Sequence, residues 1–157
     1  MADLTHIDAS GNARMVEVSD KPITKRQATA RGTITMSAIA LGEIRERRAK
    51  KGDVLAVAQL AGIGGAKQTS NLIPLCHPVP LSGVDVELTV GETGVRCTAV
   101  ARAEWRTGVE MEALSAVSTA LLTVYDMLKA VDRSMTIGPI ELLEKSGGQS
   151  GVYRRVG

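Results

Sequence analysis

The segment NLIPLCHP, residues 71–78, places a thiol beside an imidazole between two prolines. Each proline fixes its own φ angle and biases the preceding residue toward extended backbone, so Cys76 and His77 are held in a segment with little conformational freedom. Such a segment can present its side chains accurately. Three kinds of site are compatible with it: a metal site, a catalytic cysteine, or the wall of a substrate-binding site that contains Cys76 and His77.

A zinc site at this segment needs about four ligands. The chain has two cysteines and two histidines without CxxC or HxxxH spacing, so carboxylates and His6 would have to take part. A cysteine nucleophile next to its base is also unusual, because adjacent residues of an extended segment point to opposite faces. From the residues alone, a hydrogen-bonded structural imidazole is slightly favoured for His77 over a ligand contact, and a packed thiol for Cys76.

Charged side chains also interrupt an apolar helical pattern around TVYDMLKAV. Asp126 and Lys129 are three residues apart and therefore lie on the same side of a helix, where an ordinary surface ion pair would explain them. Further charges favour a site, and they occur in GVEMEAL, KKGD and AKQTS: Glu110, Glu112, Lys51 and Lys67. Lys51 precedes a turn from which its side chain can reach over a helix N-terminus. The residues alone thus predict a buried, mixed-charge site that binds a small anion.

Composition limits the kind of protein that carries this site. The 157 residues fit a single domain spanning 1–157, and 44% are hydrophobic, but phenylalanine is absent and only one Trp and two Tyr occur. A core of small aliphatic side chains needs close packing or a subunit interface, so we expect an obligate oligomer. The net charge of +2 argues against nucleic acid as a partner, and the scarcity of aromatic residues removes the stacking platforms that single-strand binders use.

The sequence also predicts where the protein is found. No apolar run approaches the roughly 20 residues that cross a bilayer, and the N-terminal stretch lacks the apolar region of a signal peptide. We therefore expect a cytoplasmic protein without membrane contact. Two cysteines are too few for a disulfide framework, and a reducing compartment would keep both as thiols.

Hydrophobic periodicity predicts the elements that position these residues. Alternation predicts a strand over 25–36, a hairpin of 83–90 with 94–105, and a last strand over 134–145. Ser37 is expected to cap a helix that runs to about residue 50. Asp53 is expected to cap a second helix that continues to residue 72, in which Gly64 and Gly65 mark a close backbone approach or an irregular turn.

The longest predicted element is a helix over 109–131. Its larger apolar residues and an opposite face of alanine and threonine predict burial on both sides. A polar arm of about residues 1–15 precedes the elements. A glycine-rich tail of about residues 146–157 follows them and is expected to be flexible unless a ligand or a neighbour orders it. Because the strands and helices lack regular βαβ spacing, they predict an antiparallel α+β sandwich.

Several segments together resemble the MoaC family, the cyclic pyranopterin monophosphate synthases of molybdenum cofactor (molybdopterin) biosynthesis: LTHID…ARMVEVS, KGDVLAVAQLAGI, NLIPLCHPVPL, TGVEMEALSAVSTALLTVYDMLKAVD and IGPIELLEKSGG. The resemblance runs from about Leu4 to Tyr153. It implies a ferredoxin-like antiparallel sheet packed against helices, a homohexamer built as a trimer of dimers, and active sites at subunit boundaries. The implied reaction is that of a lyase. It converts 3',8-cyclo-7,8-dihydro-GTP, the cyclised dihydro-GTP made by the radical enzyme MoaA, to cyclic pyranopterin monophosphate with release of pyrophosphate.

The resemblance also implies roles for individual residues. The implied catalytic residues are Asp126, Lys129 and Lys51. The implied substrate-binding residues are Leu75, Cys76, His77, Glu110, Met111, Glu112, Lys67, Arg26 and Lys145. No metal ligands and no required cofactor are implied, although Mg²⁺ can accompany the triphosphate. This chain has Gln68 and Gln149 where family members usually carry basic residues, which would thin the cationic lining around the triphosphate.

With this resemblance, the proline-bracketed segment is interpreted as a shaped substrate wall. The residue types suit the implied reaction, because lysines can act as general acid and base when burial and neighbouring cations lower their pKa. Two other functions are weighed against it. One is a non-catalytic ferredoxin-like oligomer that binds a nucleotide or nucleic acid, and the other is a metal-binding protein.

Overall fold

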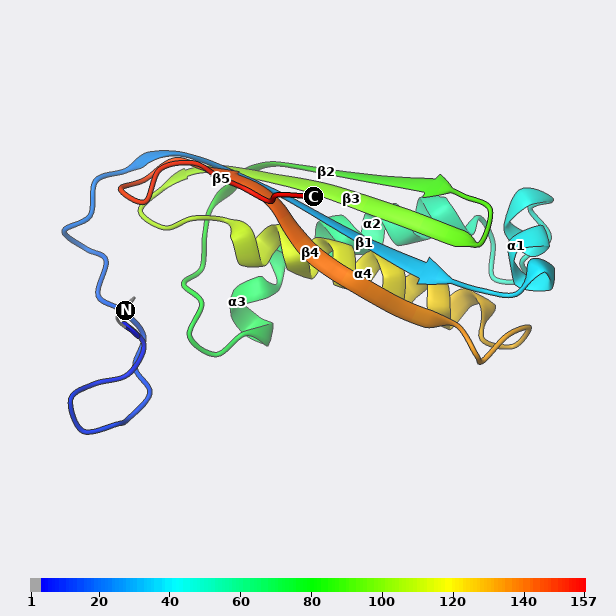
Figure 1. The fold of residues 1–157 in the computed structure, drawn as a ribbon, viewed down its shortest axis with the longest axis horizontal. Coiled ribbons are helices and arrows are strands. Elements are labelled where there is room, and N and C mark those ends of the chain that lie inside the picture. The colour runs from blue at the N-terminus through cyan, green and yellow to red at the C-terminus, as the bar shows by residue number, and fades with distance from the viewer. Residues whose placement is uncertain (1–3) are drawn as a thin grey trace.

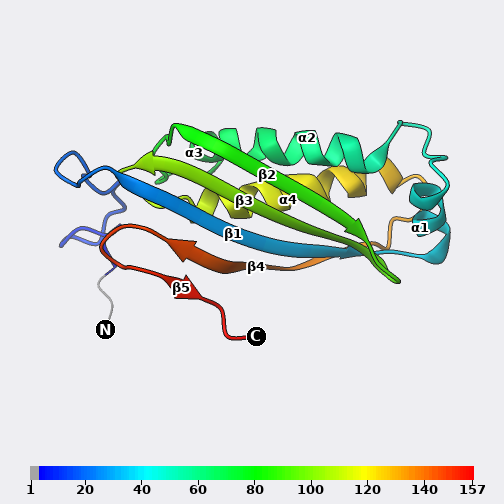
Figure 2. The ribbon, with the colours of Figure 1, turned by 90° about the horizontal axis from the view of Figure 1, so that it is seen from above.

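The computed structural model describes residues 4–157, and it contains one antiparallel sheet with helices against one face. The strands are β1 (Thr24–Thr35), β2 (Leu81–Val90), β3 (Gly94–Trp105), β4 (Thr136–Ser146) and β5 (Tyr153–Arg154), in the order β2-β3-β1-β4-β5. The helices are α1 (Ala38–Arg45), α2 (Val54–Lys67), α3 (Thr69–Leu72) and α4 (Glu110–Leu128). Figures 1 and 2 show α2 and α4 side by side beneath the sheet, with α1 at one end. The predicted antiparallel α+β fold is confirmed.

The central strand β1 pairs along its whole length with β3 in an unbroken antiparallel register. Alternate residues of β1, including Ala28, Ala30 and Ile34, are buried against the helices, as the period of two predicts. Strand β2 completes a hairpin with β3, and β4 lies on the other side of β1. The predicted strands and hairpin are therefore confirmed to within two residues at each end.

Helix α4 is buried on two faces. Val117 and Leu121 pack against β1 so closely that a Cβ added to Gly32 would lie within 3.0 Å of both side chains. The buried Ala116 is on the side that faces α2, where its carbonyl would lie 3.1 Å from a Cβ added to Gly62. The predicted long helix with two buried faces is confirmed, although it ends at Leu128 rather than residue 131.

Helix α2 covers the small-residue face of α4. A Cβ added to Gly65 would lie 2.3 Å from Thr119 Oγ1 and 2.9 Å from the Ser115 carbonyl. Gly64 and Gly65 both lie inside α2, so the close backbone approach is confirmed and the irregular turn is wrong. The alanine- and threonine-lined face of α4 is thus covered by the same chain, so its burial by itself gives no argument for an oligomer.

Helix α1 is shorter than predicted. Ser37 caps it, with its Oγ accepting a hydrogen bond from the Ala40 N–H at 3.2 Å, but the helix ends at Arg45 instead of near residue 50. Ile44 is its last buried side chain, and Arg47 adopts a left-handed φ of 53°. Tertiary packing stabilises most short helices, so a helix is not maintained where four exposed charged residues, 45–48, follow.

The second helix is also shorter than predicted, because α2 ends at Lys67 and the four residues of α3 follow a break at Gln68. The Thr69 side chain competes locally with the helical backbone at this break. Its buried hydroxyl donates to the carbonyls of Gly65, at 3.2 Å, and Ala66, at 2.9 Å, and so replaces partners that a continuing helix would supply.

The C-terminal tail is more ordered than predicted. Its strand β5 pairs with β4, with Tyr153 opposite Lys145. Gly147, Gly148 and Gly151 make the connecting turn with φ angles of 96°, 77° and 68°, which only glycine adopts readily. The first three residues of the predicted N-terminal arm lie outside the described residues. Within 4–157, none of the helices has both the length and the apolar character needed to cross a bilayer.

Candidate active site

Asp126 holds two lysines at the C-terminal end of α4. Its Oδ1 lies 2.7 Å from Nζ of Lys129, and its Oδ2 lies 2.9 Å from Nζ of Lys51. The Lys51 amine also donates to the Asp126 carbonyl at 3.0 Å. Lys51 therefore reaches the C-terminus of α4 and not a helix N-terminus, which corrects the interpretation from sequence. A cation is favoured there because the last carbonyls of a helix carry partial negative charge.

The three residues of this Lys51–Asp126–Lys129 cluster are about half exposed, with side-chain exposures of 51%, 55% and 51%. The prediction of a buried charge cluster is therefore wrong for the single chain. Hydrogen bonds from Lys129 and Lys51 lower the pKa of the Asp126 carboxyl to about 2. The carboxylate thus stays ionised at neutral pH and can orient both ammonium groups as proton donors toward a molecule bound at this surface.

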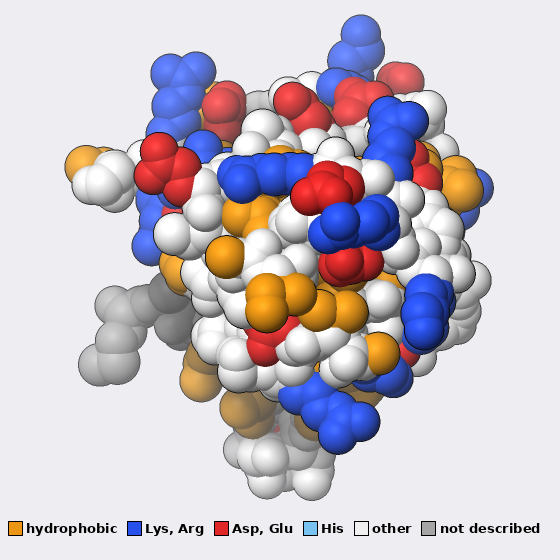
Figure 3. Space-filling model, turned by 90° about the vertical axis from the view of Figure 1, so that its right-hand side faces the viewer, with side chains coloured by type: hydrophobic (Ala, Val, Ile, Leu, Met, Phe, Trp, Pro, Cys, Tyr) orange, Lys and Arg blue, Asp and Glu red, His pale blue; other side chains and the backbone are white. Residues whose placement is uncertain are grey.

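The cluster lies at the end of the molecule that also carries α1 and the tip of the β2–β3 hairpin (Figure 1). Figure 3 views this end and shows cationic and anionic side chains intermingled around a small apolar patch. Because neither sign of charge dominates, the specific geometry around Asp126 distinguishes this cluster from its surroundings.

The proline-bracketed segment lines a cavity of about 280 Å³ at the opposite end of α4. Six predicted substrate-binding residues meet there: Leu75, Cys76, His77, Glu110, Met111 and Glu112. The N-terminal arm and the segment that leads from it to β1 close another side with residues that the sequence did not select for substrate binding: Thr5, His6, Val16, Val18 and Lys21. The structure thus gathers two motifs that lie more than 30 residues apart into one wall.

His77 is both hydrogen bonded and part of this cavity. Its Nε2 lies 2.7 Å from the Val16 carbonyl. Because a carbonyl only accepts, Nε2 is the donor of this hydrogen bond. Burial raises the pKa of the Cys76 thiol, and the nearby charge of Glu112 acts in the same direction. A protonated thiol suits a cavity wall better than a nucleophile.

Glu112 is the most buried charged group of the cavity, with 4% of its surface exposed. Burial raises the pKa of its carboxyl to about 7, and the charge of Glu110 adds to this effect. Both carboxylates lie in the first turn of α4, where the positive end of the helix dipole favours them. Glu112 can therefore change its charge near neutral pH, where general acid–base chemistry operates.

A second cavity of about 500 Å³ adjoins the first and shares Lys21, Thr107, Gly108 and Glu110 with it. It contains two more predicted binding residues, Arg26 and Lys145, together with Gln149 and an arginine that the sequence did not select, Arg106. The sequence offers one signal for Arg106, which is its position between the end of a predicted strand and the GVEMEAL motif. Lys67, at the C-terminus of α2, is exposed and lines neither cavity.

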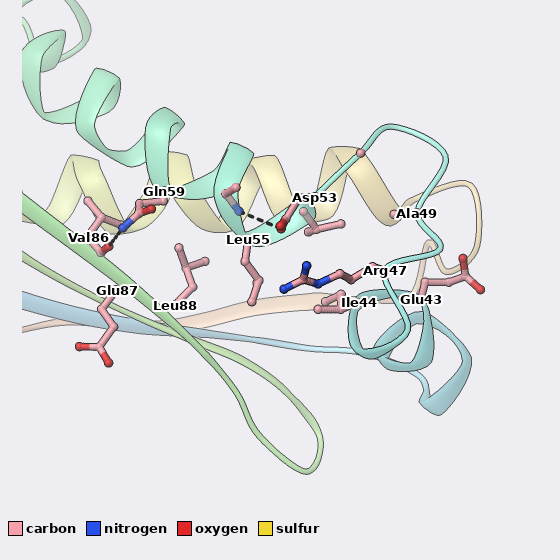
Figure 4. A pocket seen from close by; sticks show the side chains of 13 residues that line it. Glu43, Ile44, Arg47, Ala49, Asp53, Leu55, Gln59, Val86, Glu87 and Leu88 are labelled. Carbon is pink, nitrogen blue, oxygen red and sulfur yellow. Dashed lines mark hydrogen bonds between the residues drawn. The ribbon is translucent and has the colours of Figure 1, made fainter.

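A third cavity, of about 430 Å³, lies between α2, β2 and the loop after α1 (Figure 4). Asp53 caps α2 there through the Ala56 N–H, and Gln59 Nε2 donates to the Val86 carbonyl on the sheet edge. Lys51 does not line this cavity, although it is close in sequence to Asp53. None of the predicted site residues belongs to its wall, so we do not assign it to the same chemistry.

The candidate site therefore occupies both ends of α4. Sixteen residues separate Glu110 from Asp126, which at a rise of 1.5 Å per residue corresponds to about 24 Å along the helix. A single chain thus holds the acid–base cluster at one end and the cavities at the other. A ligand of nucleotide size cannot contact both within one copy.

Comparisons of the sequence with those of known proteins identify the family of this chain. The profile of the MoaC family matches residues 15–148. A protein of Thermomicrobium roseum named cyclic pyranopterin monophosphate synthase is 58% identical, over 99% of this chain and 95% of its own length. Proteins of the same name from Novosphingobium aromaticivorans and a Methylobacterium species are 56% and 60% identical over 98% of this chain and 98% and 97% of their own lengths. This chain belongs to the MoaC family.

Proposed function

We propose that this protein is a cyclic pyranopterin monophosphate synthase, a lyase of molybdenum cofactor biosynthesis. Its substrate would be 3',8-cyclo-7,8-dihydro-GTP, and its products cyclic pyranopterin monophosphate and pyrophosphate. The observation that carries this proposal is Asp126 with both lysine amines within 3 Å, because the reaction needs several proton transfers. The names of relatives that are 56–60% identical over almost the whole chain support it.

The release of pyrophosphate defines what the site must do. A substrate hydroxyl oxygen forms a bond to the α-phosphorus while the bond from that phosphorus to the pyrophosphate oxygen breaks, which closes the cyclic phosphate. The hydroxyl proton must leave, and negative charge develops on the departing pyrophosphate. Lysine amines can exchange the protons, and fixed cations can stabilise the developing charge.

The two adjoining cavities suit the two parts of such a substrate. The cavity of about 280 Å³ offers His77, Glu112 and apolar side chains to the ring system. The cavity of about 500 Å³ offers Arg26 and Lys145 to the triphosphate. Their shared wall at Lys21 would lie near the junction between base and phosphates.

The proposal includes a homohexamer arranged as a trimer of dimers, with active sites shared between subunits. The separation of about 24 Å along α4 supports sharing, because a second copy that runs antiparallel could bring its cluster to the cavities of the first. The outer faces of α2 and α4 also expose apolar side chains: Val57 at 41%, Leu60 at 70% and Leu122 at 60%. Light scattering that finds a fully active monomer would overturn this part of the proposal.

Shared sites can be tested by mixing inactive variants. Lys129→Ala damages the cluster, and Arg26→Ala damages the cavity at the other end of α4. Dimers re-formed from equal amounts of both variants should recover about a quarter of wild-type turnover, because half the dimers are mixed and each mixed dimer has one intact site. Lys129→Ala mixed with Lys51→Ala is the control and should recover nothing. Equal recovery in both mixtures would contradict shared sites.

We also propose that no resident cofactor is required and that Mg²⁺ enters only as a companion of the triphosphate. Side chains of the chain itself supply the proton donors and fixed cations that the reaction needs. Elemental analysis of the purified protein tests this directly. Stoichiometric zinc that remains after chelator treatment would contradict it.

The activity itself is tested by supplying the cyclised dihydro-GTP and following both products. Formation of cyclic pyranopterin monophosphate with an equal amount of pyrophosphate is the expected result. Binding of the substrate without turnover would instead support a non-catalytic nucleotide-binding protein.

A further inference from the structure

The cavity of about 500 Å³ has an unusual charge balance. Four cationic side chains line it, from Lys21, Arg26, Arg106 and Lys145, whereas Glu110 is the one carboxylate among its described lining residues. Lys145 is only 16% exposed, and its Nζ is 4.0 Å from Glu110 Oε1 and hydrogen bonded to Ser150 Oγ. A single carboxylate at that distance leaves the cavity strongly positive, which favours a ligand with several negative charges.

The side chain of Arg26 is held in place, but one of its hydrogen-bond donors has no acceptor among the described residues. Its Nη2 donates to the carbonyl of Arg106 at 3.0 Å, while its buried Nε has no hydrogen-bond partner among residues 4–157. The glycine turn packs directly on it, because a Cβ added to Gly148 would lie 2.0 Å from Arg26 Nη1. The guanidinium is therefore fixed, and its Nε–H is left without an acceptor among the described residues.

The side chain of Arg106 is also held in place with a hydrogen-bond donor that has no acceptor among the described residues. It follows Trp105 at the end of β3, and its Cζ lies 5.2 Å from the centre of the Trp105 ring, so one face of the guanidinium is covered. Its Nε is buried without a hydrogen-bond partner among the described residues, like that of Arg26. The donors of a guanidinium lie in its plane, so stacking on the tryptophan leaves them able to bind an anion edge-on.

We propose that Arg106 is a polyphosphate-binding residue that acts with Arg26 as a pair of guanidinium groups in this cavity. Buried N–H groups without acceptors are costly, and phosphate oxygens are strong, charged acceptors that match the guanidinium fork. Because the Arg106 carbonyl also fixes Arg26, the two arginines form one unit. The identification of the anion with the triphosphate of the substrate rests on the proposed function, whereas anion binding by Arg106 does not.

Isothermal titration of the purified full-length protein with inorganic pyrophosphate tests this inference without turnover. Arg106→Gln should weaken binding roughly ten- to a hundredfold, because charge-assisted hydrogen bonds are lost. Arg96→Gln is the matched control, since Arg96 is an exposed arginine near the other end of β3 and its loss changes the net charge equally. Its affinity for pyrophosphate should stay within about twofold of wild type.

Arg106→Lys separates the donor geometry from charge. It keeps the positive charge but lacks the guanidinium fork, so it should lose at least half of the binding free energy that Arg106→Gln loses. Circular dichroism checks that both Arg106 variants keep the wild-type fold. If one of them unfolds, the other is compared with Arg96→Gln in its place.

Two results would overturn the inference: no pyrophosphate binding by the wild-type protein, or equal affinities for Arg106→Gln and Arg96→Gln. Neither result depends on turnover of the cyclised dihydro-GTP. A protein that turns over this substrate but binds pyrophosphate independently of Arg106 would retain the proposed function and lose this inference. A protein without turnover whose pyrophosphate binding needs Arg106 would lose the proposed function and retain this inference.

Discussion

The amine of Lys51 lies 2.9 Å from Oδ2 of Asp126, although 75 residues separate them in the chain. Lys51 comes from the loop before α2, and Asp126 from the last turn of α4. The contact exists because the glycines of α2 allow the two helices to pack closely and thereby bring the start of one to the end of the other. The geometry around Asp126 is thus a product of the α2–α4 interface.

Removing either lysine amine tests the acid–base assignment. Lys51→Ala and Lys129→Ala should each lower turnover by roughly 10² to 10⁴-fold, the usual contribution of a positioned acid or base. The fold should persist, because both side chains are about half exposed. Steady-state rates of pyrophosphate release provide the measurement.

Lys50→Ala is the control for this experiment. Lys50 is exposed next to Lys51 and should behave as a solvated surface charge. If all three variants react at the wild-type rate, Lys51 and Lys129 are structural charges and the catalytic assignment fails.

Asp126→Asn tests whether the carboxylate orients the lysines. The substitution keeps the shape of the side chain and removes the charge that binds both amines, so turnover should fall strongly. Because the carboxylate is 55% exposed, the midpoint of denaturant unfolding should change little. A stable variant with the wild-type rate would show that the ion pairs do not serve the reaction.

Glu112 should make stability depend on pH. Its pKa is raised from 4.5 to about 7 in the folded protein, so the folded state binds its proton more tightly than the unfolded state does. The resulting stability is fully present below pH 4.5 and is lost as the pH rises to 7, by roughly 3 kcal/mol in total.

Glu112→Gln removes this titration. The unfolding free energy of the variant relative to wild type should therefore rise between pH 4.5 and 7 and then level off, as measured by urea unfolding across that range. A difference that does not vary with pH would indicate that a cation from a second copy compensates the carboxylate.

Adjacent glycines in α2 should respond in opposite directions to alanine. Gly65→Ala places a methyl group 2.3 Å from Thr119 Oγ1 and should lower the unfolding free energy by about 1–3 kcal/mol. Gly64→Ala meets no atom within 4 Å and should raise it by roughly 0.5–1 kcal/mol, because alanine is the better helix former. Equal effects of both variants in denaturant unfolding would contradict the close packing of α2 on α4.

The glycine turn should control the position of Arg26. Gly148→Ala would place a methyl group 2.0 Å from Arg26 Nη1, so it should weaken substrate binding and raise KM. Gly151→Ala has a similar backbone cost, with a φ of 68°, but meets nothing within 4 Å and should leave KM near wild type. A shared rise in KM would mean that backbone strain, and not displacement of Arg26, is responsible.

Local features of the sequence were sufficient to predict much of the fold. The caps at Ser37 and Asp53 are confirmed, as are the strands and the long helix. Capping and hydrophobic periodicity depend on residues within a few positions of each other, so a single sequence contains this information. The motifs that resemble the MoaC family are also contiguous segments, and they predicted the family correctly.

The tertiary structure alone decided the features that depend on distant contacts. Helix α1 ends at Arg45 because burial stops after Ile44. The prediction of a buried charge cluster is wrong for the single chain, because Asp126 lies at an open helix end. Arg106 joins Arg26 only because β1 pairs with β3 in one particular register. These outcomes arise from contacts between residues that are tens of positions apart, which periodicity and spacing along the chain do not specify.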